Sequence, residues 1–363
     1  MRFSVSHALA ERKTARNILV QAVGEDGRAG WGESCPRSYV TGETIETAKT
    51  ALLCSILPPM INTVSSNMHE TVEFLTSELA GLERSRQAAF CAAELAVLDL
   101  AGKTFGLSAG TVAGPIARRR VRYGAVIAAS SCAQVRKYAA LIRLFRFREV
   151  KVKVHKSLEQ NVKLLETARR FLGRTVVIRI DANGAWSADE AVRQLKQLSR
   201  YRLAAVEQPV SAEDIQGMQQ VTAAGLLPVV ADESLCSVHD AETLIERRAA
   251  NIFNLRVSKC GGLINTMRIY RKAALAGLGC HVGAQVGETA LLSAAGRHLA
   301  TRCPSILWCE GSYGLLLLKH DIARPGITVG VGGRARAVDR PGIGVAPDMR
   351  RIARSVTDVT EVY

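Results

Sequence analysis

Eight short apolar segments recur along residues 123–309 at a nearly regular interval, and this repeat constrains the fold more than any other feature. The segments begin at Tyr123, Val150, Val176, Leu203, Leu227, Asn251, Gly279 and Ile306. Helix-length stretches separate them, and successive segments start mostly about 25 to 28 residues apart. Parallel strands need such crossovers, so the spacing predicts an α/β fold of the (β/α)8 barrel type. An open doubly wound sheet is the alternative, and it is disfavoured because no GxGxxG turn follows the first strand.

The first 115 or so residues follow a different order, with strand patterns first and helical patterns afterwards. Residues 3–23 have the pattern of a strand that leads into a turn at 24–30. The stretch from Trp31 to Thr44 is rich in Gly, Pro, Ser and Thr, and we expect a long ordered loop there. Helices are predicted at 43–57 and 85–106. We therefore expect an α+β domain over 1–115 and a barrel over 116–334, with a C-terminal segment, about 335–363, that returns to the first domain.

Composition narrows the class of protein. With 48% hydrophobic residues among 363, the chain can bury a large core. It has no run of 18 apolar residues, and its N-terminus lacks the apolar core of a signal peptide. Its nine cysteines are scattered and form no CxxC pair, as in proteins of a reducing compartment. These features predict a cytoplasmic protein without a membrane span.

The formal net charge of +15 is the one unusual bulk property. Such a charge attracts nucleic acid, anionic surfaces or an acidic small molecule. Nucleic acid is disfavoured because the basic residues are spread over the chain and only 5% of the residues are aromatic. We expect the densest basic run, Ala117 to Arg122, to be a solvated loop before a strand. The sequence thus predicts neither a nucleic-acid nor a membrane partner.

Three carboxylates, Asp181, Glu207 and Asp232, follow the third, fourth and fifth predicted strands. The active site of such a barrel lies at the C-terminal ends of its strands, which are about 4.8 Å apart. Carboxylates this close repel one another, and a divalent cation removes the conflict. Oxygen ligands suit Mg²⁺, whereas zinc would favour His or Cys. A single acid at such a place is as readily a helix N-cap, but three together favour a metal site.

Two lysines flank these acids. Lys153 lies on the second predicted strand and Lys259 follows the sixth, so a substrate between them would meet one ammonium group on each face. A lysine near a metal and a second cation can have its pKa lowered enough to act as a base. Lys151 shares the inward face with Lys153 and would add positive charge. The alternative for each lysine is an ordinary solvated surface charge.

Other polar residues at strand ends are candidates for substrate binding or electrostatic roles. They are Asn183, Glu233, Gln285, Glu288 and Glu310.

Five motifs in this order resemble the enolase superfamily, and specifically its mandelate racemase/muconate lactonizing enzyme-like subgroup. They are KxK (Lys151 and Lys153), DxN (Asp181 and Asn183), EQP (Glu207 to Pro209), DES (Asp232 to Ser234) and KxGG (Lys259 to Gly262). The resemblance implies a modified barrel with a capping domain and Mg²⁺ on the three acids, with Mn²⁺ as the alternative metal. It also implies that Lys153 and Lys259 act as acid and base. The shared step is abstraction of a proton α to a carboxylate, with the metal stabilising the enediolate.

The same resemblance marks the regions that set specificity and two departures. It implies a lid in the first domain, for which we select Trp31, Tyr39 and Thr41. The chain begins near the middle of the first capping strand, which we expect to be short. Dipeptide epimerases of the subgroup commonly carry a DxD pair after the eighth strand to hold an ammonium group. Here Glu310 is followed by Ser312 in place of the second acid, which weakens the dipeptide interpretation.

These observations favour a Mg²⁺-dependent racemase or epimerase of an amino-acid-like or dipeptide-like carboxylate. The alternatives are a muconate-type cycloisomerase and a syn-dehydratase of the o-succinylbenzoate synthase type on the same scaffold. A non-catalytic nucleic-acid-binding protein is disfavoured by the complete set of acids and lysines. We expect a small-molecule carboxylate substrate and a homo-oligomer, and the sequence leaves the exact substrate open.

Overall fold

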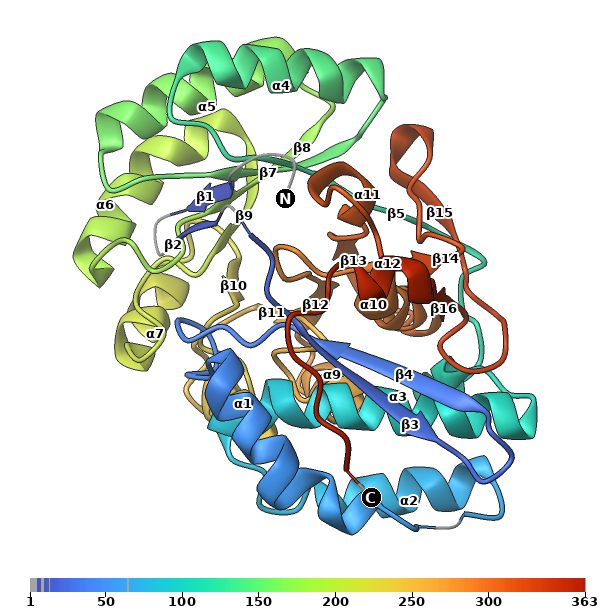
Figure 1. The fold of residues 1–363 in the computed structure, drawn as a ribbon. Helices are drawn as coiled ribbons and strands as arrows, with labels where there is room; N and C mark the ends of the chain where they lie inside the picture. The colour runs from blue at the N-terminus through green and yellow to red at the C-terminus, as the bar shows by residue number, and fades with distance from the viewer. Residues whose placement is uncertain (1–4, 8–9, 13, 64, 363) are drawn as a thin grey trace.

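A closed parallel barrel forms the centre of the molecule (Figure 1). The computed structural model describes residues 5–7, 10–12, 14–63 and 65–362. Eight strands pair in chain order, and the N–H of Gly124 donates to the carbonyl of Cys309 at 2.8 Å, which joins the first strand to the last. The strands are β6 (Ala125–Ile127), β7 (Glu149–Lys153), β8 (Val177–Asp181), β9 (Leu203–Glu207), β10 (Val229–Ala231), β11 (Ile252–Leu255), β12 (Gly279–Val282) and β13 (Ile306–Cys309). The predicted barrel is confirmed.

Helices connect the strands and cover the outside of the barrel. They are α4 (Cys132–Leu144), α5 (Leu158–Leu172), α6 (Ala188–Leu198) with η5 (Ser199–Tyr201), α7 (Ile215–Ala223), α8 (Val238–Glu246), α9 (Gly262–Leu275) and α10 (Ala290–Arg302). The capping box expected from the sequence starts α6, where Ser187 and Glu190 bond each other's backbone N–H. Outward strand residues such as Val150, Val152 and Ile180 are at most 1% exposed beneath these helices.

The N-terminal part packs strands against helices. Its strands are β1 (Val5–His7), β2 (Ala10–Arg12), β3 (Ile18–Val23) and β4 (Ala29–Ser34), and its helices are α1 (Ile45–Ala51), η1 (Leu52–Ile56), η2 (Pro58–Met60), α2 (Met68–Glu78), η3 (Arg84–Arg86) and α3 (Gln87–Phe105). The hairpin β3–β4 lies directly on α3. The two backbones are so close that a Cβ added to Gly32 would stand 2.0 Å from the carbonyl oxygen of Ala92. The single strand expected over 3–23 is instead divided among β1, β2 and β3. Residues 3, 4, 8, 9 and 13 of that prediction lie outside the described residues.

Two expectations about loops were wrong. Trp31 to Ser34 belong to β4, because the small residues Gly30 and Gly32 let this strand lie flat on α3, so the loop begins only after Ser34. The basic run at 117–122 ends in a strand, β5 (Arg120–Arg122), which pairs antiparallel with β15 (Arg334–Arg336). Sequence patterns missed both strands because β4 is Gly-rich and packs on the distant α3, and because β5 is short and pairs with the distant β15.

The remaining elements lie on either side of β5 and after the barrel. They are η4 (Ala109–Ala113), α11 (Gly314–Leu317), β14 (Ala323–Arg324), η6 (Val331–Gly333), β16 (Ala346–Pro347) and α12 (Met349–Ala353). The C-terminal segment contacts the N-terminal part: among other contacts, the N–H of Ile343 donates to Asp99 at 2.7 Å, and Lys49 pairs with Asp358 at 2.6 Å. The division at residue 115 stays a prediction. No helix within the described ranges has both the length and the apolarity to cross a membrane.

Candidate active site

The strand register places one lysine and two acids in a row at the C-terminal ends of the barrel strands. Lys153 is the direct partner of Asp181, and Asp181 is the direct partner of Glu207. Asp232 follows β10, the next strand of the barrel, and Lys259 follows β11. The order β7 to β11 therefore puts Lys153 and Lys259 on opposite sides of the three acids.

The three acids form a buried and strongly charged group. Asp181, Glu207 and Asp232 are each at most 1% exposed. The pKa of Glu207 is raised to about 8, mainly by burial; Lys151 opposes this rise and the neighbouring Asp181 adds to it. Burial also disfavours ionised Asp232, but Arg256 and Lys259 outweigh it and hold the pKa of that carboxyl below its usual range.

Asp181 and Glu207 each offer an oxygen that fits a hard divalent cation, whereas the two oxygens of Asp232 accept hydrogen bonds from Arg256 and Lys259. Asp181 Oδ2 and Glu207 Oε2 are buried and have no hydrogen-bond donor among the described residues. Glu233 Oε2, on the residue after Asp232, is in the same situation. Cationic side chains lie 3.5 Å from Asp181 Oδ2 and 3.8 Å from Glu207 Oε2, but none forms a hydrogen bond with these oxygens, which therefore have room for a metal ion. The residues at hand are thus those that Mg²⁺ prefers.

The two candidate acid/base lysines are held differently. Lys153 donates to Asn183 Oδ1 at 2.6 Å and lies 3.5 Å from Asp181, with its side chain 15% exposed. Lys259 is completely buried and donates to the backbone carbonyl of Asp232 (2.6 Å), to Asp232 Oδ1 (3.0 Å) and to the carbonyl of Asn254 (3.0 Å). One lysine is therefore partly open to the barrel mouth, and the other is enclosed.

Lys151 lies among three acids. Its Nζ is 2.8 Å from Glu207, 2.7 Å from Glu310 and 3.5 Å from Asp181. Burial opposes its charge, but these three carboxylates raise the pKa of Lys151 well above its ordinary value. Lys151 is a fixed positive charge, which suits the electrostatic part predicted for it better than proton transfer.

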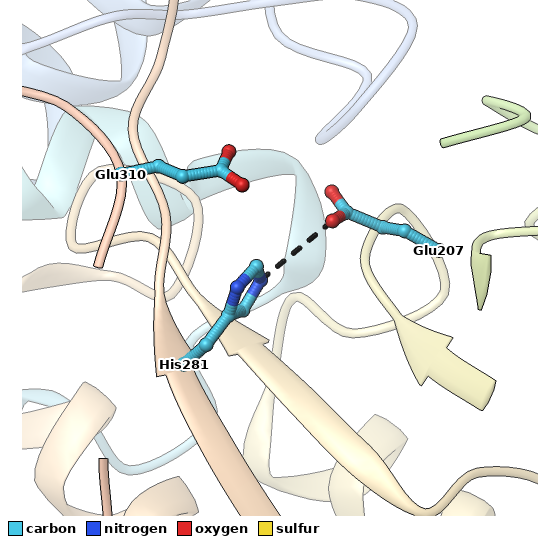
Figure 2. Close-up of side chains that lie close together, drawn as sticks. All are labelled: Glu207, His281 and Glu310. Carbon is cyan, nitrogen blue, oxygen red and sulfur yellow. Dashed lines mark ion pairs between the residues drawn. The ribbon is translucent and has the colours of Figure 1, made fainter. Parts of the chain in front are cut away.

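Sequence reasoning missed His281 and Arg179, which lie beside the predicted acids Glu207 and Glu310. Glu207, His281 and Glu310 offer ligand atoms within 4.8 Å of one another, as a metal site would (Figure 2). However, Arg179 lies 3.2 Å from His281 Nδ1, and because arginine only donates, the proton of this histidine is on Nε2, 3.8 Å from Glu207. Arg179 and Lys151 also occupy both oxygens of Glu310, at 2.5 and 2.7 Å. We therefore interpret this group as a buried ion network below the acids.

The sequence positions of Arg179 and Arg256 indicate side chains that face the barrel interior, although neither residue was among the predicted site residues. Arg179 stands two residues before Asp181, so both side chains face the barrel interior. Its guanidinium also lies 4.6 Å from the ring centre of Trp308. Arg256 hydrogen-bonds Asp232 and lies 3.4 Å from Gln285 Oε1. Counting inward positions on each strand would have found both arginines.

The other predicted polar residues lie around the same barrel mouth. Glu233 accepts from Asn183 Nδ2 at 3.2 Å. Glu288 accepts from the N–H of Gln285 and from Ser293 Oγ, each at 3.1 Å. A small cavity of about 10 Å³, enough for roughly one water molecule, is lined by residues that include Glu288 and Glu310. The structure thus brings all five of these residues to the C-terminal end of the barrel.

The three residues selected for a lid separate into two groups. Trp31 lies in β4, is 8% exposed, and its N–H donates to Asp99 at 2.8 Å, so it belongs to the core of the N-terminal part. Tyr39 and Thr41 are in the loop that follows. Between them, the carbonyl of Val40 accepts from Arg84, which also donates to the carbonyl of Glu233 at 2.6 Å. Of the three selected residues, Tyr39 and Thr41 therefore flank a contact with the barrel mouth, whereas Trp31 lies in the core.

A parallel barrel with an N-terminal α+β part and with acids and lysines at its strand ends defines a class of capped barrel proteins. Two family models identify the class further. The model described as "Mandelate racemase / muconate lactonizing enzyme, N-terminal domain" matches residues 1–114, and the model described as "Enolase C-terminal domain-like" matches 131–351. The chain belongs to this family of the enolase superfamily.

Named relatives are similar over most of their length. The L-Lys-D/L-Arg epimerase of Methylococcus capsulatus is 30% identical over 339 residues, 92% of each chain. The N-succinyl-L-Arg/Lys racemase of Bacillus cereus is 26% identical over 285 residues, 78% of this chain and 76% of the relative.

Solved structures agree with the fold. The dipeptide epimerase from Cytophaga hutchinsonii, complexed with Mg and the dipeptide D-Ala-L-Val, superposes with a TM-score of 0.87 at 26% identity, covering 97% of this chain and 94% of that one. Muconate lactonizing enzyme gives a TM-score of 0.86 at 25% identity, covering 97% and 96%.

Proposed function

We propose that this protein is a racemase or epimerase that removes and returns the proton α to a carboxylate. The observation that carries the proposal is the placement of Lys153 and Lys259 on opposite sides of Asp181, Glu207 and Asp232. A substrate between them has its α-carbon open to one ammonium or amine group from each face. One lysine removes the proton and the other supplies a proton on the opposite face, so the configuration inverts.

Asp181, Glu207 and Asp232 are the residues that would hold Mg²⁺, with Mn²⁺ as the alternative. The bound metal would supply the positive charge that stabilises the enediolate form of the substrate carboxylate. Lys151 adds a second fixed positive charge beside Glu207. The complex of the Cytophaga hutchinsonii dipeptide epimerase with Mg supports this assignment by analogy.

The substrate we favour has no free ammonium group near the end of β13. Glu310 already has Arg179 and Lys151 on its two oxygens, so a substrate ammonium there would be a third cation beside one carboxylate. The two resident cations would repel it, and this repulsion costs binding free energy. An N-acyl amino acid avoids this cost, and the N-succinyl-L-Arg/Lys racemase relative supports that class.

A cycloisomerase is the second candidate. The structural likeness to muconate lactonizing enzyme favours it over a dehydratase. In that reaction one lysine transfers the proton and the other supplies charge only. A homo-oligomeric state and a cytoplasmic location remain predictions from the sequence.

Hydrogen exchange in D₂O tests the proposal. The protein with Mg²⁺ should exchange the α-hydrogen of both enantiomers of an N-acyl amino acid, followed by NMR. Lys153→Ala and Lys259→Ala should each abolish racemisation and each leave exchange on one enantiomer only. Loss of exchange from both enantiomers in one lysine variant and from neither in the other would favour the cycloisomerase. Unchanged racemisation in both variants would refute the proposal.

A further inference from the structure

Glu94, in the middle of α3, holds the first turn of the helix that follows Lys259. Its carboxylate accepts from the backbone N–H groups of Leu263 at 3.0 Å and Ile264 at 2.7 Å. These are among the N–H groups that α9 itself leaves without a partner, and the positive end of the helix favours a carboxylate there. Glu94 has no measurable exposure, so bulk water has no access to this contact.

A second side chain of α3 holds the other end of the same turn. Gln87, two helical turns before Glu94, accepts from Asn265 Nδ2 at 3.3 Å. The same Nδ2 donates to the carbonyl of Cys260, the residue directly after Lys259, at 2.8 Å. Gln87 and Asn265 are 1% and 4% exposed. The chain from 260 to 265 is thus gripped from one face of α3.

The two glycines of the KxGG motif are required by this close approach. Gly261 and Gly262 have φ values of +78° and +97°, which favour glycine. A Cβ on Gly261 would lie 2.0 Å from Gln87 Oε1, and a Cβ on Gly262 would lie 2.4 Å from Glu94 Oε2. The motif therefore serves the contact with α3 as well as the local turn.

Lys259 is so tightly held that a movement of this turn would break its hydrogen bonds. Its Nζ is completely buried and makes three hydrogen bonds, two to Asp232 and one to the carbonyl of Asn254. Lys153, by contrast, lies on β7 and is fixed by pairing with β8, where Asp181 is its direct partner. A change at Glu94 should therefore displace Lys259 and leave Lys153 in place.

We infer that Glu94 is a positioning residue for Lys259, through which the N-terminal part of the molecule sets the geometry of one of the two bases. The inference rests on the proposed proton transfer by both lysines. Glu94 touches neither the substrate nor the metal ligands, and it acts only through the backbone of residues 260–264. Its loss should therefore weaken chemistry on one face of the substrate.

The test compares exchange on the two enantiomers of the same N-acyl amino acid with Mg²⁺ present. Lys153→Ala and Lys259→Ala first assign each enantiomer to its lysine. Glu94→Gln keeps the size of the side chain but offers only one acceptor to the two N–H groups. We expect the kcat for exchange on the Lys259 face to fall about 10- to 100-fold, since displacements of about 1 Å have such effects. Exchange on the Lys153 face and both KM values should stay within about threefold of wild type.

Two further variants keep the outcome interpretable. Leu95→Ala, one residue along and completely buried, destabilises α3 without touching the bonds to α9, and it should slow both faces equally or neither. Gln87→Ala removes the weaker contact and should give a smaller loss on the same face as Glu94→Gln, which decides the question if Glu94→Gln does not fold. Equal losses on both faces, or none, would overturn the inference. If the lysine variants themselves fail to separate the enantiomers, the proposed function fails first, and the inference with it.

Discussion

The two ends of the barrel differ in whether their charged side chains are buried and paired. At the C-terminal end, Lys151 and Arg179 are almost completely buried and each has carboxylates within 4 Å. At the other end, β5 and β15 place Arg120 opposite Arg336 and Arg122 opposite Arg334, with all four side chains exposed. In the described part of the chain, no carboxylate lies within 4.0 Å of these four guanidinium groups. The charged side chains of the site are thus paired with opposite charges. The four arginines of β5 and β15, which we call the arginine ribbon, instead hold part of the net charge of +15 without such partners among the described residues.

The comparison shows what each kind of charge costs. Burial makes an unpaired charge expensive, so the cations and acids of the site must be placed together. Exposed arginines directly opposite each other repel only modestly, because water and salt screen them. Substitutions at the site should therefore have large effects and substitutions in the ribbon small ones, and the following predictions test this in decreasing order of effect.

Asp181→Asn should be the most damaging. It removes one metal-binding carboxylate while keeping the shape of the side chain, and it also removes the charge beside Lys151 and Lys153. We expect Mg²⁺ affinity, measured by isothermal titration calorimetry, and exchange activity to fall together by about 100-fold or more. Unchanged Mg²⁺ affinity would show that our choice of ligands is wrong.

Arg179→Met should cost stability. It leaves Glu310 with Lys151 alone and removes the donor to His281 Nδ1. Breaking a buried pair by removing one partner costs about 3 to 5 kcal/mol, which urea denaturation would measure. The matched double variant, Arg179→Met with Glu310→Gln, should recover part of the lost stability. In it the carboxylate that had paired with Arg179 is no longer charged. A double variant less stable than the sum of the two single changes would contradict the ion network.

The buried Glu33 should make the free energy of unfolding depend on pH. It accepts from the N–H of Thr289 at 2.9 Å and of Leu292 at 3.1 Å at the start of α10, and burial raises its pKa to about 7. The folded state therefore binds more protons than the unfolded state between about pH 4.5 and 7, and the contribution of Glu33 is lost as the pH rises through this window. The loss is of the order of 3 kcal/mol.

Urea denaturation from pH 4.5 to 8 would measure this effect as a difference between wild type and Glu33→Gln. The glutamine has no charge to bury, so its stability should fall less steeply over the same window. Parallel curves for the two proteins would show that Glu33 does not titrate there.

The sequence predicted the barrel well because its information is periodic. Eight apolar segments at regular spacing leave few alternatives, and each strand end then points to the same edge of the sheet. It predicted Lys153, Asp181 and Glu207 as neighbours because residues at equal height on adjacent strands must meet. Loops and small sheets were predicted poorly. Trp31 belongs to a strand because α3, far along the chain, covers it, and no local pattern carries that information.

The contacts of Glu94 could not have been predicted for the same reason. A buried glutamate in an apolar helix has no local sign of its partner, and only the docking of α3 on α9 defines its role. His281 likewise lies in a short apolar strand, and its neighbours come from β8, β9 and the end of β13. The sequence thus indicates which residues share a strand edge, whereas contacts between layers need the structure.

Arg120→Glu should have the smallest effect, and of opposite sign. It replaces a like-charge pair with Arg336 by an opposite-charge pair across β5 and β15, which should stabilise the protein by about 0.2 to 1 kcal/mol in low salt. Arg120→Gln, which removes the repulsion without adding attraction, should gain less. Both gains should shrink as salt is added, while exchange activity stays unchanged because the ribbon lies away from the acids. A loss of stability in low salt, or a loss of activity, would mean that the ribbon arginines are organised as tightly as those of the site.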